Sequence, residues 1–244
     1  MTPAPRTLLA VSLIVALAAV VPLAAALPAL QLPRDTSGRS ATVWRLDNLE
    51  SIAGHPVKVL GQPRVVETPA GRAVEFDGKG DGLVLDVNPL AGLERFTLEI
   101  VFEPAADGGA EQRFLHIEES GAPNRALIEL RLLPGGAWCL DTFLRHGEAS
   151  LTLIDRALAH PVARWHSAAL VFDGQTMTHY VDGVRELGGR VAFKPLGPGR
   201  TSIGVRQNLV SWFKGRVRAI RVTPEALSPG RLMTGTATGD GGEW

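Results

Sequence analysis

The chain has 244 residues, 45% of them hydrophobic, so it can bury a sizeable core as one large β-sandwich or as two small domains. Its 25 basic and 25 acidic residues give a formal net charge of zero, with no long run of either sign. This balance argues against a nucleic-acid-binding surface or a polybasic membrane patch. Cys139 is the single cysteine, which excludes an intramolecular disulfide and a cysteine-rich metal site.

The first 26 residues have the layout of a secretory signal peptide. Arg6 precedes an almost wholly apolar stretch, residues 7–23, and three alanines at 24–26 form a small-residue processing site. We expect cleavage after Ala26 and export to the periplasm, the cell surface or the medium. The alternative is an uncleaved membrane anchor, the one contact with a membrane that the sequence allows, although Pro22 disfavours it.

Three further boundaries follow from composition. Residues 27–40 are rich in proline and small polar residues, which predicts a linker. Residues 41–230 hold regularly spaced turn signals and are predicted to be one folded domain. Residues 231–244, rich in glycine and threonine, are predicted to be a disordered tail.

The early part of the domain contains short extended segments around an Asp-Gly-rich turn at residues 77–82. Asp77, Asp81 and Asp86 offer hard carboxylate oxygens of the kind that bind calcium. The alternative is turn chemistry, because aspartate and glycine accommodate the backbone of tight turns. We favour the second interpretation and expect no bound cofactor.

Residues 96–102 alternate in a way that predicts a strand with one buried face. Its apolar face comprises Phe96, Leu98, Ile100 and Phe102, and its other face comprises Thr97, Glu99 and Val101.

Residues 126–154 predict three consecutive strands that share one register. If residues 134–136 form the first loop, Leu133 opposes Ala137 and Glu129 opposes Asp141. A second turn follows at His146-Gly147. In this register the apolar side chains point into the core together: Ile128, Leu130, Leu132, Trp138, Leu140, Leu144, Leu151 and Leu153.

The opposite face of these strands collects polar groups and one aromatic ring. Planar charged groups that bind hydroxyls and an aromatic platform are what a ligand site on a sheet needs. The alternative is a solvated face with cross-strand ion pairs, each worth tenths to about 1 kcal/mol. The candidate ligand-binding residues are His116, Glu129, Arg131, Asp141, Phe143 and Arg145.

The stretch from Trp165 to Gly183, W-H-S-A-A-L-V-F-D-G-Q-T-M-T-H-Y-V-D-G, predicts a β-hairpin around Asp173-Gly174. It resembles the hairpin of laminin-G-like domains in the concanavalin A-like lectin/glucanase superfamily, whose usual form is W-H-H-V-A, Y-D-G and L-Y-V-D-G. Segments similar to other family motifs are Phe76-Asp77-Gly78, Phe96-Thr97, Ser202-Ile203-Gly204, Phe213 to Val222 and Leu227-Ser228.

The resemblance spans about residues 41–228 and implies an all-β fold. The expected architecture is a single-domain jelly-roll β-sandwich of two antiparallel sheets. We expect its core to include Phe96, Ile100, Leu130, Trp138, Leu140, Leu170 and Val217.

Function follows less directly, because one fold serves many functions. In this superfamily the concave sheet face often binds glycans, so the leading hypothesis is an exported, non-catalytic binding module for a glycan or surface polysaccharide. A second is a glycosidase or polysaccharide lyase on the same face, using the opposed Glu129 and Asp141 or His116 as a base. A third is an envelope or adhesion protein that contacts another protein through its sheet edges or Trp212-Phe213.

Known catalytic and metal patterns are absent from the sequence. The Glu-x-Asp-x-x-Glu motif of laminarinase-type hydrolases does not occur around Glu99 and Glu103, and there is no H-E-x-x-H or G-x-S-x-G. The six histidines are scattered along the chain, and we expect His55, His146 and His160, which lie beside turn residues, at the surface.

Overall fold

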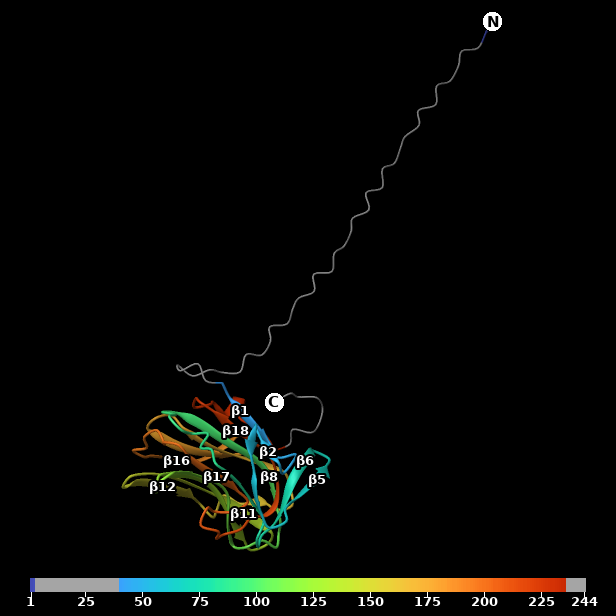
Figure 1. Ribbon diagram of the computed structural model, residues 1–244. Coiled ribbons are helices and arrows are strands. Elements are labelled where there is room, and N and C mark those ends of the chain that lie inside the picture. Colours follow the sequence, from blue (N-terminus) through green and yellow to red (C-terminus); the bar gives the residue numbers. More distant parts are fainter. Residues whose placement is uncertain (3–39, 236–244) are drawn as a thin grey trace. The chain divides into compact units, whose positions relative to one another are not determined.

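The computed structural model describes residues 1–2 and 40–235 (Figure 1). Nearly all of the predicted signal peptide and of the predicted linker lies outside the described residues. In the part of the chain that is described, no helix is long and apolar enough to cross a membrane. The one helical segment among these residues is a short 3-10 turn, η1 (Pro229–Arg231).

The strands form two antiparallel sheets, seen as two layers in Figure 1. Sheet I has the order β16 (Val184–Arg190), β15 (Thr176–Val181), β14 (His166–Phe172), β8 (Phe96–Pro104), β18 (Lys214–Thr223), β6 (Gly71–Asp77) and β5 (Arg64–Thr68), with β1 (Thr42–Arg45) paired to β18. Sheet II has the order β12 (Ala149–Ile154), β11 (Ala137–His146), β10 (Arg125–Leu133), β9 (Glu111–Glu119), β17 (Gly199–Ile203), β7 (Gly82–Leu85) and β4 (Lys58–Leu60), with β13 (His160–Pro161) paired to β11. A separate small hairpin joins β2 (Ser51–Ile52) to β3 (His55–Pro56). The predicted jelly-roll sandwich is confirmed.

The register predicted for β10, β11 and β12 is also confirmed. Leu133 pairs with Ala137 across the three-residue loop, and Glu129 pairs with Asp141. In that loop Gly135 and Gly136 have φ of 80° and 74°, a backbone region that glycine adopts without steric cost. The apolar side chains of these strands consequently share the inner face of sheet II.

The predicted hairpin is formed by β14 and β15, with Phe172 opposite Met177. The Asp173 carboxylate accepts the backbone N–H groups of Gln175 and Thr176 at 2.9 and 2.8 Å, which closes the loop. The next turn, into β16, uses Asp182 and Gly183 with φ of 48° and 78°, the pattern of a two-residue hairpin turn.

The core lies between the two sheets and contains every residue predicted for it. Phe96, Ile100, Leu130, Trp138, Leu140, Leu170 and Val217 all belong to one buried cluster. Four aromatic rings meet near its centre: Phe102 lies 4.5 Å from Phe114 and 5.1 Å from Trp138 between ring centroids, and Phe114 lies 5.0 Å from Phe213.

The outer face of β8 differs from the prediction, because it is buried as well. The chain after β18 folds across it, so that Leu227 and Leu232 pack with Ala169, Val171 and Tyr180 in a second apolar cluster. Polar groups of β8 anchor this segment: Leu227 N donates to Thr97 Oγ1 at 2.9 Å, and Met233 N donates to Glu99 Oε1 at 2.6 Å. The folded domain therefore extends to at least Gly235 rather than ending at residue 230; residues 236–244 lie outside the described range.

Candidate ligand-binding site

The outer face of sheet II carries a hollow of about 200 Å³, which we call the arginine pocket. It is lined by Arg113, Arg125, Leu127, Glu129, Arg131, Asp141, Phe143, Thr152 and Arg206.

Strand geometry explains how these side chains meet. Alternate residues of a strand point to the same face, so Leu127, Glu129 and Arg131 of β10 project outward opposite Phe143 and Asp141 of β11. On the other side of β10 the pairing with β9 contains a bulge between Ile128 and Glu129, which makes Arg113 rather than Phe114 the partner of Glu129. Arg206 comes from the loop that follows β17.

Two carboxylates form the floor of the pocket and are almost completely buried. Glu129 and Asp141 are 3% and 2% exposed. Arg113 Nε lies 3.0 Å from Glu129 Oε2, Arg131 Nη2 lies 3.3 Å from the same oxygen, and Arg131 Nη2 also donates to Asp141 Oδ2. Glu111, the first residue of β9, pairs with both arginines, and its Oε2 lies 2.9 Å from Arg131 Nη1.

This burial changes the acidity of both groups. Burial, with a smaller contribution from neighbouring Asp141, raises the pKa of Glu129 to about 7, although Arg113 acts in the opposite direction. Burial also raises the pKa of Asp141 against the opposing effect of Arg131. Near neutral pH the floor therefore holds a carboxyl group that readily gains or loses a proton.

Several polar groups of the pocket have no hydrogen-bond partner among the described residues. They include Asp141 Oδ1 and Arg125 Nε, both of which are buried. Arg125 instead lies over the Phe143 ring, 4.9 Å from its centroid, and its Nη1 donates to Pro123 O at 2.8 Å. Arg206 is half-buried, and its guanidinium makes no hydrogen bond or ion pair with any residue the structure describes. A polar group without a partner is costly, and the unpaired guanidinium of half-buried Arg206 gives the pocket free donors for a polar ligand.

Of the six predicted site residues, the structure places Glu129, Arg131, Asp141 and Phe143 in the pocket. His116 and Arg145 do not line it. His116 is 1% exposed and accepts the backbone N–H of Gln207 at Nδ1, 3.1 Å away, because the loop carrying Arg206 folds over it. Arg145 lies at the end of β11, where its Nε donates to Gly147 O at 3.0 Å.

The neighbourhood of His116 keeps its imidazole neutral. Burial, followed by the positive charges of Arg206, Arg125 and Arg113, lowers the pKa of His116 to about 3. Its Nε2 lies 3.0 Å from Glu118 Oε2. His116 is therefore a structural support beneath the pocket and not a base facing a ligand.

Sequence analysis missed three arginines of the pocket. Strand alternation could have predicted Arg125, because positions 125, 127, 129 and 131 share one face of β10. Arg113 was hidden by the bulge in β9, which shifts the alternation by one residue. Arg206 lies in a loop, where no periodicity predicts direction.

Comparison with known proteins identifies the family. A family model described as the concanavalin A-like lectin/glucanases superfamily matches residues 77–232, which is more than half of the chain. The chain belongs to this superfamily. A search of curated proteins finds no match to the sequence.

Solved structures of the same architecture resemble the domain at low sequence identity. Domain 4 of AbnA, a GH43 extracellular arabinanase from Geobacillus stearothermophilus solved in complex with arabinotriose, has a TM-score of 0.59 at 17% identity, covering 78% of this chain and 94% of that one. A SAP-like pentraxin from Limulus polyphemus has a TM-score of 0.54 at 14% identity, covering 67% and 81%. The binding domain of botulinum neurotoxin serotype D has a TM-score of 0.55 at 14% identity, covering 77% of this chain but 48% of that one. These likenesses establish the superfamily fold and not the ligand.

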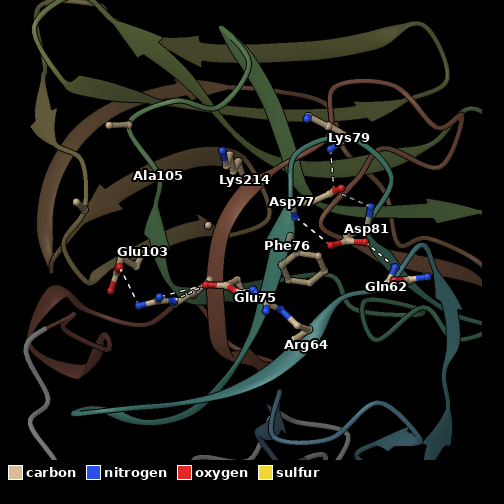
Figure 2. A pocket seen from close by; sticks show the side chains of 14 residues that line it. Gln62, Arg64, Glu75, Phe76, Asp77, Lys79, Asp81, Glu103, Ala105 and Lys214 are labelled. Atoms are coloured by element: carbon tan, nitrogen blue, oxygen red, sulfur yellow. Dashed lines mark hydrogen bonds and ion pairs between the residues drawn. The ribbon is translucent and has the colours of Figure 1, made fainter.

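A second and larger hollow of about 800 Å³ lies at β6 and β18, and we call it the charged groove (Figure 2). One row of residues crosses four strands of sheet I there, in the order Arg64, Glu75, Arg216 and Glu103. Glu75 accepts Arg64 Nη2 at 2.6 Å and both Nε and Nη2 of Arg216 at 3.1 Å, and Arg216 Nη1 reaches Glu103 at 3.4 Å. The charges of this row are already paired.

The aspartates proposed for calcium lie partly in this groove and are used by the turn itself. Asp77 Oδ1 accepts the backbone N–H groups of Lys79, Gly80 and Asp81 at 2.8, 3.0 and 3.1 Å. Asp81 binds the N–H groups of Gln62 and Asp77 at 2.7 and 3.1 Å (Figure 2), and Asp86 is exposed. Within residues 40–235 no group of three or more His, Cys, Asp or Glu side chains is arranged to hold a metal ion.

Two other expectations need correction. His160 is not a free surface group: its Nε2 lies 2.6 Å from Glu186 Oε1, and the same carboxylate lies 3.4 Å from Nε2 of fully buried His179. The histidines are scattered in sequence, but folding gathers these two at one edge of the sandwich. Phe213 is fully buried in the core and offers no surface to a partner protein, whereas Trp212 beside it is half-buried.

Proposed function

We propose that this domain is a non-catalytic binding module for a glycan or surface polysaccharide and that the arginine pocket holds the ligand. The observation that carries the proposal is the combination, in one hollow, of the carboxylates of Glu129 and Asp141 with two guanidinium groups, those of Arg125 and Arg206, that pair with no carboxylate of the described structure. A sugar offers hydroxyl groups that both donate and accept, so it satisfies both sets. The superfamily membership and the arabinotriose complex of AbnA domain 4 support this choice.

A carbohydrate-active enzyme on the same face is the second candidate. The pKa of Glu129, about 7, favours it, because proton-transferring carboxyl groups often have pKa values near neutrality. However, Arg131 contacts both Glu129 and Asp141, and His116 is buried and neutral under Gln207. Glycoside hydrolysis requires two carboxyl groups free to act on the sugar, so we place binding before catalysis.

The first experiment passes the protein over immobilised polysaccharides, with and without calcium, and assays the same mixtures for new reducing ends and unsaturated sugars. We expect retention without release. Released sugars would favour the enzyme instead, with Glu129 and Asp141 as catalysts. Absence of retention on every polysaccharide would contradict the proposal and direct attention to a protein partner at the cell envelope.

The pocket itself is tested by Asp141→Asn, which keeps the shape of the side chain and removes its charge. A hydrogen bond to a charged group contributes about 1.5–3 kcal/mol, so we expect the affinity for a retained glycan to fall at least about tenfold. Glu75→Gln in the charged groove is the matched control and should leave affinity unchanged. Equal affinities of all three proteins would place the ligand elsewhere.

Export completes the proposal. The apolar N-terminal segment and its alanine processing site support secretion, which would bring the domain into contact with extracellular or surface glycans. N-terminal sequencing of the protein recovered from outside the cytoplasm tests cleavage after Ala26; an intact N-terminus in the membrane fraction would show the anchor.

A further inference from the structure

We infer that the arginine pocket recognises an acidic sugar unit, one that carries a carboxylate or sulfate group, and that Arg125 and Arg206 hold this group. The inference rests on the proposed function, since it names the class of glycan bound at the same site. It follows from the charge balance of the pocket and from which of its arginines are already paired.

The arginines of the pocket fall into two pairs. Arg113 and Arg131 are tied to the carboxylates of Glu111 and Glu129, and Arg131 also to Asp141. Arg125 and Arg206 make no ion pair with any carboxylate within the described residues. Among the side chains that line the pocket in the described structure, four are arginines and two are carboxylates, so cationic charge is in excess.

The excess charge converges on one region. Arg206 lines the same hollow as Arg125 and Glu129, and its charge acts to lower the pKa of Arg125, of His116 and of Glu129, whose pKa burial raises overall. Burial is the larger cause of the lowered pKa of Arg125, and Arg206 is the largest of its charged neighbours. Two half-buried guanidinium groups that repel each other gain most from an anion placed between them.

Other charges near Arg125 do not neutralise it. Its cross-strand neighbours are Arg145 on β11 and Glu118 on β9. Glu118 acts on Arg125 only as a nearby charge, while its Oε2 lies 3.0 Å from His116 Nε2. Arg145 adds a further positive charge.

The chemistry of the site favours a sugar acid over a bare anion. A guanidinium fork matches the planar oxygens of a carboxylate and also binds sulfate. The Arg125 guanidinium lies over the Phe143 ring, and the exposed hydroxyl of Thr152 lines the same hollow, where it can donate to or accept from a sugar hydroxyl. A ligand that satisfies both features carries an acidic group and hydroxyl groups on one unit.

The test compares binding of the full chain to three kinds of polysaccharide at one ionic strength: a polyuronate, a sulfated polysaccharide and a neutral polysaccharide. The variants are Arg206→Gln and Arg125→Gln, with Arg72→Gln as the matched control. Arg72 is an exposed arginine of β6 that pairs with Glu67, away from the pocket. Arg206→Gln removes a side chain without partners in the described structure, so it should fold normally, which circular dichroism verifies.

We expect the wild-type chain to prefer an acidic polysaccharide and both pocket variants to lose at least about tenfold in affinity for it, with Arg72→Gln unchanged. Inorganic sulfate should compete with the bound polysaccharide better than chloride at equal ionic strength. Preference for the polyuronate or for the sulfated polysaccharide shows whether the pocket binds a carboxylate or a sulfate group.

Two results overturn the inference. If the chain binds only the neutral polysaccharide, or if Arg206→Gln and Arg125→Gln bind an acidic one as well as the wild type does, the acidic group is not read here, while the proposed glycan module survives. If none of the three polysaccharides binds, the inference and the proposed function both fail.

Discussion

The arginine pocket on sheet II and the charged groove on sheet I are both lined by arginines and carboxylates, yet the groove has about four times the volume, about 800 against about 200 Å³. In the groove, four basic and four acidic side chains of the described structure balance one another. In the pocket, arginines outnumber carboxylates by four to two in the same part of the chain. By volume alone the groove would be the better candidate for a ligand site, whereas the excess of unpaired positive charge favours the pocket.

Burial deepens the difference. Glu75 of the groove is a quarter exposed and pairs with both Arg64 and Arg216; burial raises its pKa, but its two arginines together hold the pKa below the usual value. Glu129 of the pocket also contacts two arginines, but its burial exceeds their effect and raises the pKa to about 7. A glutamate paired with two arginines therefore has a lowered pKa and stays ionised where it is near solvent, but has a raised pKa near neutrality where it is buried.

The largest expected effect of this contrast is on stability. Arg131→Met leaves Glu129 and Asp141 buried without the one arginine that contacts both in the described structure, which should lower the free energy of unfolding by about 3–5 kcal/mol. Arg216→Met in the groove removes a partly exposed ion-pair partner and should cost at most about 1 kcal/mol. Urea unfolding followed by circular dichroism measures both, and equal losses would mean that burial does not distinguish the two sites.

The next effect concerns pH and has opposite signs at the two sites. Glu129 is protonated in the folded chain up to pH about 7 but in the unfolded chain only to about pH 4.5, so its contribution is complete below about 4.5 and is lost as pH rises through 7. The shift corresponds to about 3 kcal/mol. The stability of the wild type relative to Glu129→Gln should therefore fall between pH 5 and 8.

Glu75 gives the matched comparison. Its folded pKa is lowered, so its contribution is present above its unfolded pKa and is lost as pH falls through the folded value. The wild type relative to Glu75→Gln should thus lose stability on acidification. Parallel curves for the two variants, followed from well below pH 4.5 up to pH 8, would show that the two carboxyl groups do not differ in this way.

The contrast also shows how far sequence reasoning extends. Alternation and one loop length were enough to align Glu129 with Asp141, because a one-residue slip would have exposed the apolar face of three strands. The same rule failed at Arg113, since a bulge in β9 changes the alternation without changing the composition. The position of the Arg206 side chain depends on the path of a loop, and long-range contacts determine that path.

The outer face of β8 illustrates a second limit. Thr97 and Glu99 were expected to face solvent. The segment after β18 instead crosses sheet I, and its Leu227 N and Met233 N donate hydrogen bonds to them. The segment contains three apolar residues without periodicity, Leu227, Leu232 and Met233. The sequence therefore indicates that they are buried but not which surface they cover. Strands predict their own faces; they do not predict which distant segment covers them.

The smallest expected effect separates geometry from charge within the arginine pocket. Phe143→Leu keeps all four arginines but removes the ring over which Arg125 lies, 4.9 Å from its centroid. A cation–π contact at a partly exposed site is worth about 0.5–1 kcal/mol, so affinity for the retained glycan should fall about two- to fivefold. In the groove, Arg216 is held by two carboxylates instead, and its position requires no ring.

Phe143→Tyr is the control for this change, because it keeps the ring and should keep the affinity. Isothermal titration of the wild type and both variants with the same glycan resolves the difference. If Phe143→Leu binds as tightly as the wild type, the position of Arg125 is set by Pro123 O and its strand alone, and the pocket, like the groove, would depend on charge without aromatic support.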